Sequence, residues 1–139
     1  MPPFGQTLPA ERRRRGPDFF ANFERALVPA LGGEVDLVVH GGDLLYRSKV
    51  PATLVERALG PLRRVADAGV PVFLVPGNHE RSTIPTHLLL GHPNIHIFDR
   101  ARSFERTLKG IRTTFMGFPY LRGDLRRQFR PMLKSAGLE

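Results

Sequence analysis

Cysteine is absent from the sequence, and so are long runs of apolar residues. Without cysteine the chain cannot form a disulfide or a zinc site with thiolate ligands, and nothing in the composition indicates secretion. No run is long enough to cross a bilayer, and residues 1–10 lack the apolar core of a signal peptide. We therefore expect a cytoplasmic protein that is not inserted into a membrane.

Acidic residues and lysine are also scarce. The 139 residues include 13 Asp and Glu against 21 Lys and Arg, most of them arginine, and the formal net charge is +8. A hydrophobic share of 41% with 24% charged residues is typical of a folded domain, or of part of a larger one. The basic balance favours a phosphate-bearing partner, although scattered arginines equally well form a solvated surface.

The beginning of the chain divides into two parts. Residues 1–17 contain several prolines and the run Arg12–Arg15 without an apolar period, which predicts an irregular basic arm. From Asp18 onward, apolar residues recur every three or four positions as far as Gly32, which predicts an amphipathic helix. Pro29 removes a helical hydrogen bond and clashes one turn back, so we expect a kink or an early end there.

Two strands around a helix follow. Residues 35–40 form a short, apolar and β-branched run that predicts a buried strand, and residues 70–75 form another. Between them, apolar residues at helical spacing over 51–69 predict an amphipathic helix. This βαβ unit has parallel strands, so the loops after Val39 and Val75 are expected to leave the sheet at the same edge.

The rest of the chain predicts shorter elements. We expect a strand at 95–98, a hairpin of strands 103–108 and 111–116 around Lys109-Gly110, and a terminal amphipathic helix at 125–133. The predicted fold class is therefore α/β.

Polar residues follow both strands of the βαβ unit, at Gly42-Asp43 and at Gly77-Asn78-His79-Glu80. Glycine lets the backbone turn sharply and lets a ligand approach closely. A carboxylate can bridge two divalent ions, an amide oxygen can complete the shell of one ion, and a histidine can donate to a phosphate oxygen or leaving group. The loops thus indicate metal-assisted phosphoester hydrolysis, although the same residue types occur in ordinary turns.

The two motifs resemble those of the calcineurin-like metallophosphoesterases, whose consensus runs D-x-H, G-D, G-N-H-D/E and finally G-H-x-H. The stretch from Val35 to Arg81 looks most like the DNA-repair exonuclease branch typified by SbcD and Mre11, and residues 117–120 resemble a segment of that branch. The resemblance implies a partial αββα sandwich of two sheets over residues 18–139. Tyr46 stands where protein phosphatases usually have a second aspartate, which disfavours a Ser/Thr phosphatase.

The resemblance also implies roles for single residues. Asp43 would bridge two metals, Asn78 would be a ligand of the second metal, and His79 would stabilise the transition state or protonate the leaving oxygen. Two divalent metal ions are implied, and Mn²⁺ is the expected metal.

Three neighbouring residues have weaker assignments. Glu80 either orients a nearby group or is a solvated turn residue. Arg47 and Arg81 closely follow the motif loops, and they either meet the phosphate of the substrate or remain in solvent. His40 ends a buried strand just before the turn that presents Asp43, so it is expected to be a hydrogen-bonded core residue rather than a ligand. The other histidines have no ligand spacing to the motifs and are expected to be structural or at the surface: His87, His92 and His96.

Two blocks of the family consensus are missing from the sequence. No D-x-H precedes the first helix, and no G-H-x-H follows Tyr120. Because both blocks supply metal ligands, we expect an incomplete two-metal site with weak binding, together with a sheet that lacks a strand. The chain therefore resembles a piece of a longer protein.

Three functions remain open at this stage. The leading hypothesis is a metal-dependent phosphoester hydrolase, and more narrowly a DNA exonuclease or phosphodiesterase. The first alternative is a non-catalytic nucleic-acid-binding or scaffold remnant of the same fold, and the second is a small-molecule phosphoesterase acting on nucleotides. Salt-sensitive DNA binding without metal-dependent turnover would favour the first alternative.

Overall fold

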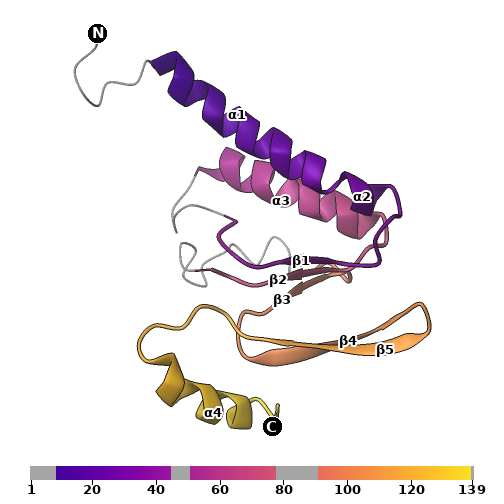
Figure 1. Ribbon diagram of the computed structural model, residues 1–139, viewed down its shortest axis with the longest axis vertical. Coiled ribbons are helices and arrows are strands. Elements are labelled where there is room, and N and C mark those ends of the chain that lie inside the picture. Colours follow the sequence, from indigo (N-terminus) through magenta and orange to yellow (C-terminus); the bar gives the residue numbers. More distant parts are fainter. Residues whose placement is uncertain (1–8, 45–50, 78–90, 139) are drawn as a thin grey trace.

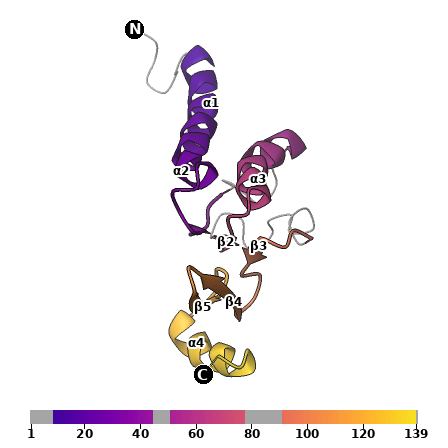
Figure 2. The same cartoon turned by 90° about the vertical axis from the view of Figure 1, so that its right-hand side faces the viewer.

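A computed structural model describes residues 9–44, 51–77 and 91–138, with the backbone alone for 9–17. In chain order the elements are α1 (Pro9–Ala26), α2 (Val28–Leu31), β1 (Val38–His40), α3 (Ala52–Asp67), β2 (Val72–Leu74), β3 (Ile95–Ile97), β4 (Arg102–Leu108), β5 (Ile111–Gly117) and α4 (Leu125–Ser135). Figures 1 and 2 show α1 and α3 on one side of the β1–β3 sheet, the β4–β5 hairpin on its other side, and α4 beyond the hairpin.

The first sheet has the strand order β1-β2-β3, and both pairs of neighbours are parallel. Val72 lies opposite Val38 in β1 and opposite Ile95 in β3, so the three strands are in step. Helix α3 connects β1 to β2, which confirms the predicted βαβ unit. The predicted α/β class is confirmed as well, with two sheets that face each other as in a partial metallophosphoesterase sandwich.

The main core fills the space between the helices and the first sheet. Apolar positions of α3 repeat at helical spacing, so one face of the helix packs on β2 and β3. Burial of this face removes a large apolar area from water, which is the dominant stabilising term for such a layer. The residues with no exposed surface belong to this contact: Leu59, Leu62, Val65, Val72 and Leu74.

A second, aromatic layer joins the first sheet to the hairpin. Strand residues alternate between the two faces of a sheet, so Phe73 and His96 point away from the helices. Phe73 stacks on Phe115 of β5 with ring centroids 4.0 Å apart, and His96 lies 4.8 Å from Phe104 of β4. Strands β2 and β3 therefore contribute side chains to the main core on one face and to the aromatic layer on the other.

Helix α1 begins earlier than the sequence predicted. The predicted irregular arm covered residues 1–17, whereas the helix starts at Pro9 and continues through Gly16-Pro17. Ala, Glu and Arg have favourable helix propensity, and the fixed φ of proline suits a helix even though one hydrogen bond is lost. The arm prediction is therefore wrong for residues 9–17.

Most other predicted elements are present with shifted ends. The break near Pro29 is confirmed, because α1 ends at Ala26 and a new turn, α2, starts at Val28 with that proline in its first positions. The strands predicted at 35–40 and 70–75 have three residues each. The second of them starts after Pro71, which has no N–H to donate to a ladder.

The hairpin and the last helix agree closely with the sequence. Lys109 and Gly110 both have positive φ, 49° and 78°, as a two-residue turn that matches the twist of its strands requires. The carboxylate of Asp124 accepts a hydrogen bond of 3.0 Å from the backbone N–H of Arg126 and thereby caps α4. Among the described residues, no helix combines the length and hydrophobicity needed to span a membrane.

Candidate functional site

The two motif loops start side by side at one edge of the first sheet. Strand β1 ends at His40 and β2 ends at Leu74, and the two are paired in register. Directly beyond them the backbone N–H of Val75 donates a 3.0 Å hydrogen bond to the carbonyl of His40. The prediction that both loops leave the sheet at the same edge is confirmed.

Close backbone contact holds the two loops together. A Cβ atom on Gly42 would lie 2.8 Å from the Cα of Gly77, and a Cβ atom on Gly77 would collide with the backbone nitrogen and carboxylate of Asp43. Real Cβ atoms do not tolerate such distances, so both positions need glycine at this approach. The two motifs are far apart in the sequence, but in the fold Asp43 and Gly77 are in direct contact.

Asp43 adopts an unusual backbone conformation. Its φ is 56°, in the left-handed region, and the preceding Gly42 has a φ of 105°. Aspartate is among the few residues that occupy this region with modest cost, and such conformations concentrate at functional sites. The turn leaves Asp43 exposed at the edge of the sheet.

His40 supports the first loop from below. Its Nδ1 accepts a 3.2 Å hydrogen bond from the backbone N–H of Gly42, which places the proton of the neutral ring on Nε2. The ring also meets Phe23 of α1 edge to face, with centroids 5.9 Å apart. These contacts support the structural role expected for this histidine.

The segment after β5 returns to the same edge. The backbone N–H of Tyr120 donates a 3.1 Å hydrogen bond to the carbonyl of Pro76, immediately before the second motif. Tyr120 keeps 41% of its surface exposed, so its side chain is accessible beside the loops. The sequence indicates residues 117–120 only through their resemblance to a segment of the family, which does not place them at the site. The topology carried that signal, because a hairpin after β3 must return to the edge where β3 ends.

Five of the predicted site residues lie outside the described residues: Arg47, Asn78, His79, Glu80 and Arg81. Their roles stay predictions, and the same holds for the expected placement of His87. Of the predicted metal ligands, the structure places Asp43, against the glycine that precedes Asn78 in the chain.

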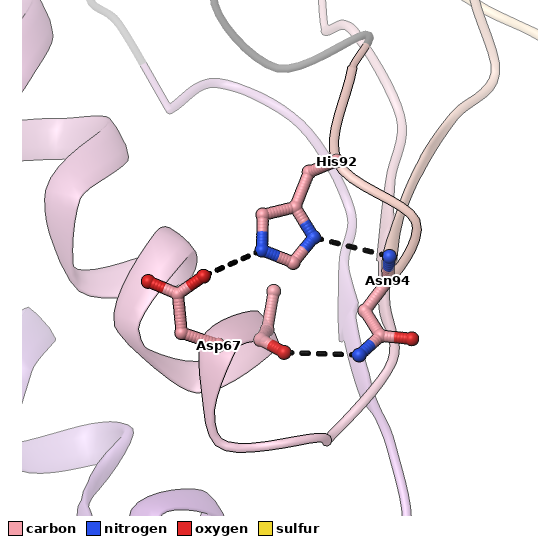
Figure 3. Close-up of polar contacts among 4 residues, drawn as sticks. Asp67, His92 and Asn94 are labelled. Atoms are coloured by element: carbon pink, nitrogen blue, oxygen red, sulfur yellow. Dashed lines mark hydrogen bonds and ion pairs between the residues drawn. The ribbon is translucent and has the colours of Figure 1, made fainter.

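His92 has a structural environment (Figure 3). Its Nε2 lies 2.6 Å from a carboxylate oxygen of Asp67, and its Nδ1 accepts a 3.1 Å hydrogen bond from the backbone N–H of Asn94. The side-chain amide of Asn94 in turn donates to the carbonyl of Ala66 at 3.0 Å. These bonds connect the end of α3 to the loop before β3, as expected for a histidine outside the metal site.

His96 is held between the two sheets. A guanidinium nitrogen of Arg106 lies 2.7 Å from Nε2 of His96, so the ring accepts this contact in its neutral form. Burial, helped by the positive charges of Arg106 and Arg102, lowers the pKa of His96 to about 4. A neutral ring of this kind is a core residue, which agrees with the sequence-based expectation.

The described residues fit a divalent metal in part. The Asp43 carboxylate is a hard oxygen donor of the type that such ions prefer. Within the described ranges, however, no group of three or more His, Cys, Asp or Glu side chains gathers to hold an ion. The described part of the chain does not, by itself, make a two-metal site.

Parallel strands thus bring Asp43 against Gly77 at one edge of the first sheet, and the hairpin forms a second sheet behind them. Residues 16–128 match the calcineurin-like phosphoesterase family. The chain belongs to this family, and it resembles the Mre11 branch.

Relatives in that branch come from several archaea. The chain is 47% identical over 72 residues to the DNA double-strand break repair protein Mre11 of Haloferax volcanii, and 34% identical over 76 residues to that of Aeropyrum pernix. These matches cover 50% and 55% of this chain but 15% and 19% of the relatives. A longer match, 26% identical over 112 residues, covers 77% of this chain and 28% of the Mre11 protein of Saccharolobus solfataricus.

Proposed function

We propose that the protein acts in metal-dependent hydrolysis of phosphodiester bonds, with DNA as the substrate. The contact between Asp43 and Gly77 carries this proposal, because it sets the first motif directly beside the start of the second. The names of the relatives, DNA double-strand break repair proteins, favour DNA among phosphodiesters. The net charge of +8 also favours a polyanionic substrate.

The proposed roles follow the chemistry of each side chain. Asp43 and Asn78 offer oxygen ligands to divalent metal, with Mn²⁺ as the proposed ion, and His79 donates a proton to the leaving oxygen. When bound, the metal would supply Lewis-acid stabilisation of negative charge on phosphate. Arg47 and Arg81 bind non-reacting phosphates, and Glu80 orients a neighbouring donor.

Two substitutions test the proposed site. With Mn²⁺ and a small chromogenic phosphodiester, Asp43→Asn and His79→Ala should each lower kcat/KM by about 100-fold or more, which is the usual cost of losing a proton donor or a metal ligand. Asp43→Asn should also weaken Mn²⁺ binding in a titration, because it replaces a charged ligand with a neutral one. Asp67→Asn, a carboxylate change at the far end of α3, is the matched control.

Full activity in both site variants would contradict the residue assignment. Hydrolysis of nucleotides without hydrolysis of DNA would move the proposal to a small-molecule phosphoesterase. The second candidate function is non-catalytic binding of nucleic acid, which the net charge of +8 favours as well. Metal-independent DNA binding with no turnover in any divalent metal would identify that function.

A further inference from the structure

We propose that one face of α4 binds the sugar-phosphate backbone of DNA. Arg126, Arg130 and Lys134 are four residues apart, so they lie one above the other on one side of the helix, and we call them the basic ridge. This inference rests on the proposed function for the choice of DNA as the polyanion. It adds a binding surface formed by none of the residues assigned to the reaction.

The basic ridge is available to a partner. All three of its side chains are exposed, and none forms an ion pair with a carboxylate of the described residues. Within the described residues of 121–138 the only acid is Asp124, whose carboxylate caps the helix and lies 3.6 Å from Arg127 instead. Several cations elsewhere differ in this respect, since each has an acidic partner: Arg63, Arg64, Arg102, Lys109 and Arg112.

The adjacent apolar face of α4 favours DNA over a lipid surface. A helix that binds a membrane turns its apolar face outward into the lipid. Here the Phe129 ring meets Phe118 edge to face at 5.8 Å, and Met132 and Leu133 are half-buried, so part of the apolar face is directed back at the protein while Leu125 and Phe129 keep 45% and 40% of their surface exposed. The cations are left on the outer side, which suits a phosphate backbone.

The chain segment that leads into α4 passes the candidate site. Residues 118–124 run from the hairpin to α4 and pass the site edge, where Tyr120 is bonded to Pro76 (Figure 1). From Arg126 to Lys134 the helix rises about 12 Å, enough to follow roughly three phosphates of one strand.

Equilibrium DNA binding without metal tests the proposal. Fluorescence anisotropy of a labelled 20-base-pair duplex in EDTA, from about 50 to 200 mM KCl, gives Kd and its salt dependence. The triple variant Arg126→Gln, Arg130→Gln, Lys134→Gln should raise Kd at least tenfold and lower the slope of log K against log salt by about 2 to 3.

The matched control removes the same number of charges elsewhere. Arg64→Gln, Lys109→Gln, Arg112→Gln also loses two arginines and one lysine, but these cations are already paired with acids. The control should change Kd by less than about threefold. Far-ultraviolet circular dichroism establishes that each variant keeps its helices.

Three outcomes would overturn the proposal. Equal weakening in both triple variants would mean that overall charge, rather than the ridge, binds DNA, and no weakening in either would exclude the ridge. Ridge-dependent binding to phosphatidylserine vesicles in place of DNA would assign α4 to a membrane surface. Hydrolysis of the small phosphodiester is measured separately, so its loss in Asp43→Asn with normal DNA binding leaves the ridge intact.

Discussion

Single atoms decide the geometry of the candidate site. Gly77 has no side chain, and the space that a methyl group would need is filled by the backbone nitrogen and carboxylate of Asp43. Nothing in this contact is apolar or large. The contact restricts the position of Asp43, because the backbone of Gly77 lies directly beside the left-handed turn at Asp43.

Gly77→Ala should therefore disturb the site more than its size suggests. We expect a loss of about 1–3 kcal/mol in the free energy of unfolding, as for overpacking elsewhere, and a larger relative loss of phosphodiesterase activity because Asp43 must move. Urea unfolding and kcat/KM with Mn²⁺ measure the two effects. Gly41→Ala is the control, since a Cβ atom there meets nothing within 4 Å. Equal behaviour of the two variants would show that the contact does not hold the loop.

At the scale of elements, the sequence predicts which segments are helices and strands better than it predicts the residues at which they begin and end. Hydrophobic periodicity identified α3, and the Lys109-Gly110 turn identified the hairpin, because each is a local signal strong enough to decide the structure. The predicted start of α1 is wrong, because the helix propensity of the surrounding residues outweighs the helix-breaking effect of proline and glycine. The place of Tyr120 depended on a return path through three strands, which no local pattern contains.

At the candidate site, too, local sequence patterns predict some features, and others depend on contacts between distant segments. That the Gly-Asp and Gly-Asn-His loops share an edge followed from the parallel βαβ unit, and the contact between Asp43 and Gly77 bears it out. The left-handed φ of Asp43 and the support from His40 did not follow, because both depend on atomic distances between loops. The sequence indicates His96 only as a surface or structural residue, and its contacts with Phe104 and Arg106 of β4 depend on the packing of the hairpin.

The contact of His96 with the hairpin should make stability depend on pH. The pKa in the folded protein, about 4, lies below the ordinary value of 6.5, so between these values the unfolded chain binds a proton that the folded chain does not. Stability should therefore be complete above about pH 6.5 and decline as the pH falls toward 4, by on the order of 1 kcal/mol after allowance for solvent screening.

His96→Gln separates this effect from general acid unfolding. Glutamine can still accept from Arg106 but does not titrate. Urea unfolding at several pH values between 4 and 7 should show a smaller decline for the variant than for the natural protein. Parallel curves would mean that His96 does not couple the sheet to the hairpin.

At the scale of the whole molecule, the described part of the chain leaves one side of the first sheet, along β1, without a paired strand. Among the described residues β1 pairs with β2 alone, and Val39 keeps 60% of its surface exposed on that strand. An uncovered strand with an apolar side chain is a template for pairing with another chain.

Val39→Lys should reduce self-association, because a charge on an edge strand opposes pairing with a second copy. Sedimentation velocity over a range of concentrations should show a larger monomer fraction for this variant. Val28→Lys, a charge added at a similarly exposed valine of α2, controls for the change in net charge. If both variants remain monomeric to the same extent as the natural protein, the β1 edge is not a site of association.

The alternation of side chains along β2 has a consequence for cooperativity. Val72 and Leu74 belong to the core under the helices, and Phe73 between them belongs to the aromatic layer under the hairpin. These three consecutive residues thus contribute to both cores, one on each side of the sheet. Neither core can lose its packing without exposing β2 on the side of the other, so we expect the helical layer and the hairpin to unfold in one cooperative transition.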